Sequence, residues 1–351
     1  MQNPDELSEM GARRPTVTTI SRRAGVAAST VSRALKGDPR IAKKTRAEIL
    51  EIAKEVGYMP YASARAMVTG QSGLIGFVTG GTDNPFYSEM LEVLVSRAGR
   101  RRRRVMVLHA GTEPLEESTV ETLVQYQMDG CIITSAELSS RAADICHRFR
   151  VPVVMMNRVP LIHSSAVSCN NYGGSELLIE LLLAAGHKKI AIVGGTQNTS
   201  TSLDRQRGAA DALARRGLEP VVQVDGQSNY MGGLKATALI IAESHRPDAI
   251  YAVNDIMAMG VVDALGAHGI RVPDDVSVIG FDDIRSASWP RYSLTTVAQP
   301  IDAMVDRSLD LLEARIAENE TPAEAIHIAG KLRLRRSCRL PDDLVSFQQF
   351  V

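Results

Sequence analysis

From Leu74 onward, short apolar runs alternate with amphipathic segments of helical length. The first run is LIGFV at residues 74–78 and the last is VSVIGF at 276–281. The runs between them lie at residues 105–108, 130–134, 151–156, 189–194 and 249–253. Continuous apolar strands separated by helices are typical of parallel sheets that helices cover on both faces. Seven such runs in a chain of 351 residues predict an α/β core with two doubly wound parallel-sheet lobes.

Residues 17–57 follow a different pattern, that of three short helices. Gly25 is suited to the left-handed conformation that a tight turn between the first two helices needs. A second helix is expected over residues 28–35, and the third should end at Gly57. The second helix would expose hydroxyl side chains and Arg33, as a helix in the DNA major groove requires. This region therefore predicts an all-α helix-turn-helix head.

Charge is unevenly distributed along the chain. The whole sequence contains 40 Lys and Arg and 40 Asp and Glu, so its net charge is zero. Residues 1–72 carry twelve of the basic residues and seven of the acidic ones, and the remainder therefore has an equal acidic excess. A basic head on an acidic body is expected when only one end of a protein contacts phosphates.

Several classes of protein are disfavoured. The longest apolar stretches, such as Leu177–Ala185 with Glu180 inside it, are much shorter than the roughly 20 residues of a membrane span. The N-terminus lacks the apolar centre of a secretory signal. We therefore expect a cytoplasmic protein. The four cysteines are widely spaced, which favours reduced structural thiols. The histidines lack metal-binding spacing, and no P-loop or GxSxG motif occurs, so we expect no metal, no cofactor and no enzymatic activity.

Two other functions share the alternating strands. An NAD-dependent dehydrogenase would leave the basic head unexplained, and no GxGxxG follows the apolar runs at 74–78 or 190–193. A sugar-binding protein of a transport system would need an export signal. The run Arg100–Arg104 could form a nucleic-acid patch, but its place between a helix and a strand of the core favours a solvated surface.

Ordered motifs occur in both parts of the chain. The head contains AGV, TVSRAL, KKTR and GY. The core contains NPFY (84–87), GHKKIAIVGG (186–195), PDAIYAVNDIMAMG (247–260), VPDDVSVIGFDD (272–283) and LTTVAQP (294–300). With these motifs the chain resembles the lactose-repressor/galactose-repressor family over roughly residues 16–340. The resemblance implies a repressor of carbohydrate-metabolism genes that binds a pseudo-palindromic operator as a homodimer and is switched by a small sugar-like effector.

The resemblance also implies a domain organisation. It places a disordered tail at 1–15, the helix-turn-helix domain at 16–60, a hinge helix at 61–72, an effector-binding and dimerisation core at 73–340 and a second tail at 341–351. The core is similar to a periplasmic binding protein, with three crossovers between its lobes. Its N-lobe would take about 73–169 and 301–328, and its C-lobe about 170–300 and 329–340. The second tail is too short for the leucine-heptad helix that makes tetramers in some relatives, which favours a dimer.

Candidate DNA contacts follow from the same resemblance. Base reading is assigned to Ala28 and Ser29, at the start of the recognition helix. The other candidates in the head are Thr16, Thr18, Thr30, Ser32, Arg33, Arg40 and Thr45. In the hinge they are Ala64 and Met67, where Met67 takes the place of a leucine that opens the central base step in the minor groove. Ala27 and Ala42 stand at helix N-cap positions where the family usually has serine.

The effector site is expected between the two lobes. Arg205 matches the family arginine that binds vicinal hydroxyls or a carboxylate of the effector. The other candidates are Phe86, Tyr87, Asn157, Arg158, Asn254 and Asp282. For each of them, and for Trp289, a solvent-facing or locally paired side chain is the alternative. Because only 4% of residues are aromatic, a polyhydroxylated sugar or sugar acid is favoured over a nucleobase.

Overall fold

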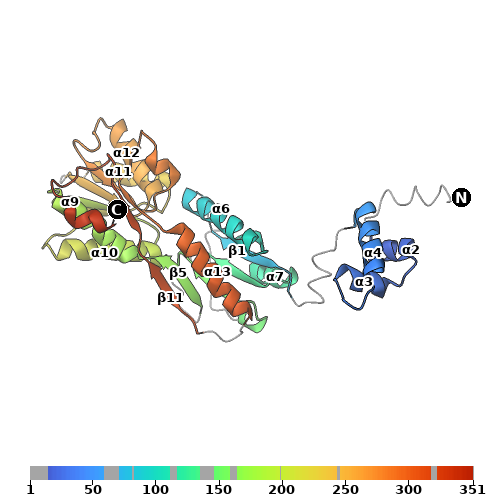
Figure 1. Ribbon diagram of the computed structural model, residues 1–351. Helices are drawn as coiled ribbons and strands as arrows, with labels where there is room; N and C mark the ends of the chain where they lie inside the picture. Colours follow the sequence, from blue (N-terminus) through green and yellow to red (C-terminus); the bar gives the residue numbers. More distant parts are fainter. Residues whose placement is uncertain are drawn as a thin grey trace. The chain divides into compact units, whose positions relative to one another are not determined.

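The computed structural model describes residues 15–58, 71–80, 83–110, 117–134, 146–158, 164–197, 199–242, 246–317 and 322–350. The chain divides into two compact units, residues 1–72 and residues 73–351 (Figure 1). Most of the expected N-terminal tail and of the expected hinge, with Ala64 and Met67, lies outside the described residues.

The first unit is a small helical head. Its helices are α2 (Val17–Ala24), α3 (Ala28–Leu35) and α4 (Lys43–Glu55). They enclose a core in which Ile20, Val31 and Ile49 are fully buried. Gly25 ends α2 with a φ of 64°, the left-handed conformation that the sequence predicts for this turn. The three predicted helices are therefore confirmed almost to the residue.

The starts of these helices differ in their capping. Thr16 forms a capping box with Thr19 at the start of α2, where its hydroxyl accepts a hydrogen bond from the Thr19 N–H. Ala27 and Ala42 hold the N-cap positions of α3 and α4, and in the described head no side chain caps either helix. Both helices thus begin with backbone N–H groups that lack side-chain acceptors.

Within the described part of the second unit, the N-lobe is built on a six-stranded parallel sheet with the order β11-β5-β4-β3-β1-β2. Its strands are β1 (Leu74–Thr79), β2 (Arg104–His109), β3 (Gly130–Ile133), β4 (Val153–Met156), β5 (Ser165–Cys169) and β11 (Ala325–Ile328). Its helices are α6 (Pro85–Arg100), α7 (Glu117–Gln125) and α13 (Ile301–Ala317). Side chains of β1 alternate between two clusters, since Phe77 packs with α6 and Val78 packs with α7. Helices therefore cover both faces of the sheet.

The C-lobe is built on a parallel sheet that has the order β7-β6-β8-β9 in the described residues. Its strands are β6 (Ile190–Gly194), β7 (Val222–Asp225), β8 (Ala249–Ala252) and β9 (Ser277–Ile279). Its helices are α9 (Asn171–Ala184), α10 (Ser200–Ala214), α11 (Tyr230–Ala242) and α12 (Asp255–Ala267). Glycines let these helices approach closely, because a Cβ at Gly233 of α11 would collide with the Met257 carbonyl of α12.

The chain passes between the lobes three times within the described residues. It leaves the N-lobe after β5 for α9, returns before α13, and leaves again after β11. A small antiparallel pair, β10 (Thr296–Ala298) with β12 (Lys331–Arg333), lies on the last two passages. Two 3-10 helices, η1 (Arg285–Ser288) and η2 (Val345–Phe350), complete the C-terminal part of the chain. The described chain thus has three crossovers between two parallel-sheet lobes.

One expectation about the surface of the core needs correction. The run Arg100–Arg104 is not uniformly solvated, because Arg101 donates to Asp310 over 2.7 Å and Arg103 pairs with Asp129. The four cysteines all lie in the described residues, where each is buried and free of a disulfide, as expected. In the part of the chain that the structure describes, no helix has the length and apolar character of a membrane span.

The uncapped helices lead to a stability prediction for the head. We expect Ala27→Ser and Ala42→Ser each to stabilise it by about 1 kcal/mol, because the new hydroxyl accepts a hydrogen bond from an N–H of the first turn. Hydrogen exchange in the full chain should then show about fivefold more protection of head amides. Ala47→Ser, at an exposed position inside α4, is the matched control and should lower protection slightly. Equal effects at Ala27 and Ala47 would contradict the capping argument.

Candidate functional site

A cavity of about 260 Å³ lies between the lobes, where the carboxyl ends of strands from both sheets meet. Gly80 follows β1, Thr134 follows β3 and Asn157 follows β4, while Thr196 follows β6 and Val253 follows β8. The predicted effector residues all line this cavity, namely Phe86, Tyr87, Asn157, Arg158, Arg205, Asn254 and Asp282. Trp289, in contrast, is 57% exposed on the surface.

A buried ion pair forms the wall of the cavity on the C-lobe side. Arg205 of α10 and Asp282 are 5% and 3% exposed, and Arg205 Nη1 lies 2.9 Å from Asp282 Oδ1. Arg205 also donates through Nε to Asn171 Oδ1 over 2.7 Å and through Nη1 to the Val253 carbonyl over 2.7 Å. Its guanidinium stacks 3.8 Å from the centre of the Phe281 ring. These contacts fix the direction of the guanidinium before any ligand binds.

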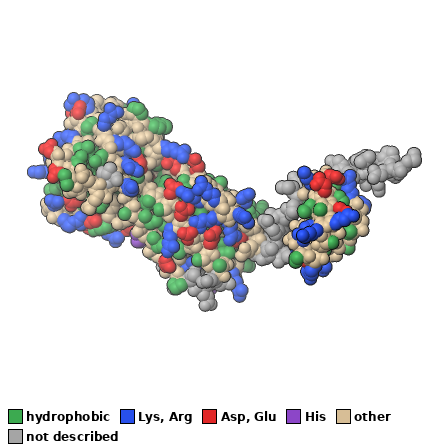
Figure 2. All heavy atoms as spheres, in the orientation of Figure 1, with side chains coloured by type: hydrophobic (Ala, Val, Ile, Leu, Met, Phe, Trp, Pro, Cys, Tyr) green, Lys and Arg blue, Asp and Glu red, His purple; other side chains and the backbone are tan. Residues whose placement is uncertain are grey.

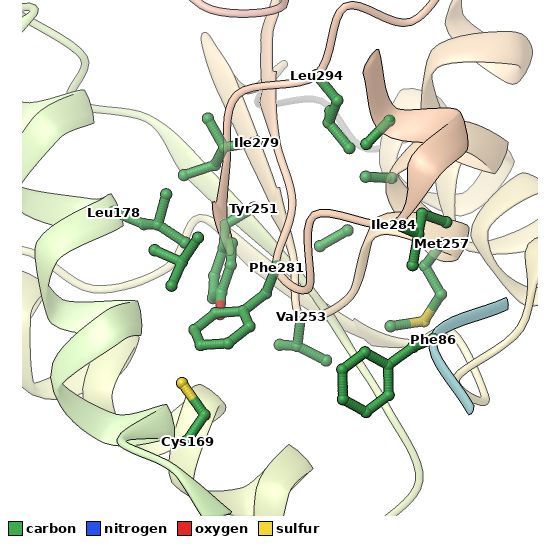
Figure 3. Packing of buried hydrophobic residues seen from close by; sticks show 14 of the residues in the cluster. Phe86, Cys169, Leu178, Tyr251, Val253, Met257, Ile279, Phe281, Ile284 and Leu294 are labelled. Carbon is green, nitrogen blue, oxygen red and sulfur yellow. The ribbon is translucent and has the colours of Figure 1, made fainter. Parts of the chain in front are cut away.

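The Phe281 ring belongs to the main hydrophobic cluster. Figure 3 shows it close to Tyr251 among the buried side chains, with Phe86 at the edge of the same group. Phe86 and Tyr87 meet edge to face with their ring centres 5.4 Å apart. Phe86 is buried and Tyr87 is half-buried, so the apolar wall expected from the sequence is present in the cavity.

Asp282 is held in an unusual conformation. Its φ of 128° is rare for a residue with a side chain, and such strain is often found at functional sites. Its carboxylate accepts hydrogen bonds from Gln299 Nε2 over 2.7 Å and from Asn84 Nδ2 over 3.2 Å. Burial raises the pKa of Asp282, and the charge of Arg205 opposes that effect. Because Asn84 begins α6 of the N-lobe, Asp282 connects the two lobes.

Asn254 has local partners. It is the N-cap of α12, where its Oδ1 accepts from the Met257 N–H over 2.9 Å and its Nδ2 donates to the Ser228 carbonyl over 3.2 Å. Asn254 therefore lines the cavity and at the same time starts a helix. Its side chain is locally paired, which was the alternative to an effector contact, and it still faces the cavity.

Arg158 follows β4 of the N-lobe, lines the cavity and also bridges the lobes. It donates through Nη2 to the Tyr87 hydroxyl over 2.8 Å, and through Nη1 to Thr201 Oγ1 over 3.2 Å and the Asn157 carbonyl over 2.6 Å. Tyr87 belongs to α6 of the N-lobe and Thr201 to α10 of the C-lobe. Asn157 has a φ of 57°, and its Oδ1 has no hydrogen-bond partner among the described residues.

A second buried carboxyl group lies behind Asp282. Asp255 accepts hydrogen bonds from Thr296 Oγ1 over 2.7 Å and from the Ile284 N–H over 3.0 Å. Complete burial and the nearby charge of Asp282 raise the pKa of Asp255 to about 8. Asp255 is therefore largely protonated at neutral pH, whereas the charge of Arg205 favours the ionised form of Asp282.

Several cavity residues were missing from the sequence prediction. Most of them carry short hydroxyl or amide side chains, and they include Asn84, Thr196, Thr199, Thr201, Ser202 and Ser228. For the four of them between residues 196 and 202, the polar string TQNTSTS after Gly195 was an available signal, since side chains that follow a parallel strand point toward this edge of the sheet.

The predicted DNA contacts of the head are mostly on its surface. Ala28, Ser29 and Arg33 of α3 are exposed, and so are Thr16 and Thr18. Thr30, Ser32 and Thr45 are half-buried. Arg40 is exposed but pairs with Asp38 over 2.7 Å. Figure 2 shows Lys and Arg side chains on the visible face of the head, consistent with the basic excess in its sequence.

Both parts of the chain match known families. Residues 16–61 match the model for bacterial regulatory proteins of the lacI family, and residues 179–338 match the periplasmic binding protein-like domain. The ribose operon repressor of Escherichia coli (strain K12) is 31% identical over 327 residues, which cover 92% of this chain and 99% of that repressor. The chain belongs to the lacI family of bacterial regulatory proteins.

Solved structures of this family share the fold. The lac repressor dimer bound to operator and the anti-inducer ONPF has a TM-score of 0.84 and 26% identity, over 93% of this chain and 99% of that one. A lacI family regulator from Enterococcus faecium with bound ribose has a TM-score of 0.70 and 25% identity, over 77% of this chain and 100% of that one. The predicted helix-turn-helix head and two-lobed periplasmic-binding-protein-like core are thereby confirmed.

Membership of the lacI family decides between the functions that the sequence left open. This family member is a DNA-binding transcriptional regulator with an effector-binding core. Its relatives are repressors, so the expectation of a regulator rather than an enzyme is confirmed.

Asp255 leads to a pH prediction for this lacI family regulator. Its folded-state pKa of about 8 exceeds the usual 3.8, so the folded protein keeps a proton that the unfolded chain releases. The resulting stabilisation is complete below about pH 4 and is lost as pH rises toward 8, by at most about 1.4 kcal/mol per pH unit. Asp255→Asn removes this dependence, so its free energy of unfolding relative to the parent should increase from pH 5 to pH 8.

Urea unfolding at several pH values between 5 and 8 measures this difference. Asp275→Asn is the control, because the hydrogen bond from Arg271 lowers the pKa of Asp275 to about 2 and its titration ends below that range. If the free energies of unfolding of the parent and of Asp255→Asn change in parallel between pH 5 and pH 8, Asp255 is ionised in the folded protein.

Proposed function

We propose that this regulator is a homodimeric repressor of carbohydrate-metabolism genes, which binds a pseudo-palindromic operator and changes its operator affinity when a sugar-like effector occupies the cavity. The observation that carries the proposal is the buried Arg205–Asp282 pair, which presents donors and acceptors in fixed positions between two lobes. Operator DNA lies in the bacterial cytoplasm, so the protein is expected to act there.

The head supports a role for α3 as the recognition helix. Ala28 and Ser29 stand exposed in its first turn, where a helix in the major groove contacts base edges. Arg33 is exposed one turn further on and is suited to a guanine or a phosphate. We assign the other head residues, Thr16, Thr18, Thr30, Ser32, Arg40 and Thr45, to the phosphate backbone. Release of Arg40 from Asp38 would be needed for that contact.

A sugar-like effector fits the size and chemistry of the cavity. A volume of about 260 Å³ is below the roughly 300–1,000 Å³ of pockets for drug-sized ligands, which favours a small molecule. The wall combines the Phe86 and Tyr87 rings with many hydroxyl and amide groups, as a molecule with both CH faces and hydroxyls requires. A solved relative contains ribose, and the ribose operon repressor is similar over almost its whole length.

We also propose that residues 61–72 form a hinge helix that reads the centre of the operator, and this predicts a specific effect of substitutions at Met67. Met67→Gly should weaken binding to operator DNA much more than to scrambled DNA, because glycine removes the intercalating side chain and costs about 1 kcal/mol of helix propensity in each hinge. Phosphate contacts of the head remain, so non-specific binding should hardly change. Met67→Leu, with almost the same volume, should bind operator at least as tightly as the parent.

Fluorescence anisotropy at one salt concentration, with an operator selected from random duplexes, measures these affinities. If Met67→Gly keeps the full preference for operator, the segment 61–72 acts as a tether and not as a reading element.

If the effector binds in the cavity, substitutions at the Arg205–Asp282 pair should abolish the effect of the effector on operator binding. Arg205→Met alone leaves Asp282 as an unpaired buried charge and should destabilise the core by about 3–5 kcal/mol. The double variant Arg205→Met with Asp282→Asn avoids this and should bind operator like the parent. It should lose effector affinity by roughly 30-fold to several thousand-fold. Arg207→Met, at an exposed position of the same helix, should respond normally.

Calorimetry with a panel of pentoses, hexoses and their acids and phosphates finds the effector, and anisotropy with the same compounds measures its effect on operator binding. An unchanged response in the double variant would refute the assignment of the cavity as the effector site.

A further inference from the structure

Arg158 is a buried charge without a counter-charge among the residues that the structure describes. Its side chain lines the cavity and the residue is only 7% exposed. Its partners are a carbonyl and two hydroxyls, and among the described residues no carboxylate lies within ion-pair distance of it. Its Nε is buried and has no hydrogen-bond partner in the described part of the chain. Buried guanidinium groups are normally paired, and the described part of the chain does not supply the carboxylate that burial of Arg158 usually demands.

The carboxylates of the cavity do not supply that partner. Asp282 is engaged by Arg205, Gln299 and Asn84. Asp83, which also lines the cavity, is exposed. The cavity therefore has an uncompensated positive charge next to Arg158, whereas the charges of Arg205 and Asp282 cancel each other.

The start of α10 lies against the same side. Thr199, Thr201 and Ser202 form its N-cap and first turn and line the cavity, and Thr201 accepts the hydrogen bond from Arg158. The Thr199 side chain does not cap the helix, and its first turn contains no acidic residue. A helix of this length directs partial positive charge and N–H donors toward an anion.

The two sides are close enough for one small molecule. Thr201 and Arg205 are four residues apart on α10, so their Cβ atoms are about 5–6 Å apart. An anionic group next to Arg158 and Thr201 would thus place neighbouring hydroxyls at the Arg205–Asp282 pair. Asn157 Oδ1, which has no partner in the described residues, offers a further acceptor for a hydroxyl.

We propose that the effector is an anionic polyol, a sugar acid or a sugar phosphate, whose charged group binds Arg158 and the first turn of α10 while its hydroxyls bind Arg205 and Asp282. This inference rests on the proposed function, since it names the chemical class of the effector in the same cavity.

Calorimetry on the full chain without DNA tests the proposal with matched ligands. The neutral sugars are ribose and glucose, and their charged counterparts are ribonate, gluconate, ribose 5-phosphate and glucose 6-phosphate. At least one charged ligand should bind about ten- to a hundredfold more tightly than its neutral parent, the effect expected from a charge-assisted hydrogen bond. Tighter binding of the acids identifies a carboxylate, and tighter binding of the phosphates identifies a phosphate ester.

Two variants locate the preference. Arg158→Met keeps most of the side-chain volume and should abolish the advantage of the charged ligand, and Thr201→Val should reduce it. Arg207→Met removes an exposed arginine of α10, and this variant should still bind the charged ligand more tightly than its neutral parent. Thermal unfolding of each variant checks the fold, and Arg158→Met should not lower the midpoint, because it removes an unpaired buried charge.

Different outcomes separate this inference from the proposed function. Neutral sugars could bind as tightly as their acids and phosphates, with binding lost in the Arg205–Asp282 double variant. That result would support the cavity as the effector site and would refute an anionic effector. A charged-ligand preference that survives in Arg158→Met also overturns the assignment. If none of the six compounds binds, both the anionic class and the sugar-like effector are rejected.

Discussion

The Arg205–Asp282 ion pair is the contact on which the regulatory core depends. It joins α10 to the segment after β9, and Asp282 also receives a hydrogen bond from Asn84 at the start of α6 in the other lobe. The pair is tolerated inside the protein because Arg205 and Asp282 both have further hydrogen-bond partners, and because burial raises the pKa of the neighbouring Asp255. The same arrangement leaves a polar, preformed wall that faces the cavity, so binding requires little reorganisation of this side.

The helices of the head and seven strands of the core could be predicted from the sequence, because their apolar patterns are strong. The strands β5, β7, β10, β11 and β12 were missed for physical reasons. β5 is buried although it contains serines, since Ser165 and Ser168 find hydrogen-bond partners next to β11. β7 is an edge strand with alternating burial, and β10 and β12 are only three residues long.

Seven of the residues that line the cavity were expected from the family resemblance, and the general position of the site was expected because side chains after parallel strands meet at one edge. Their partners could not be predicted. Nothing in the sequence indicated that Asn84 would donate to Asp282, which is almost 200 positions away. Nor did it indicate that none of the described carboxylates would pair with Arg158. Such contacts depend on how the lobes close, and a linear pattern does not contain that geometry. The protonated state of Asp255 likewise follows from burial in three dimensions.

Helix α6 connects the cavity with the part of the N-lobe where the core begins. Its first turn contributes Asn84 and Tyr87 to the bonds with Asp282 and Arg158 at the cavity. At its other end Arg103 pairs with Asp129, which accepts a hydrogen bond from the N–H of Gly73, the first residue of the core. Sixteen residues of α-helix span about 24 Å and bend little. A ligand that replaced the bonds at the cavity end would therefore act on a stiff element whose other end is followed by Arg103, which is linked through Asp129 to the residue where the core begins.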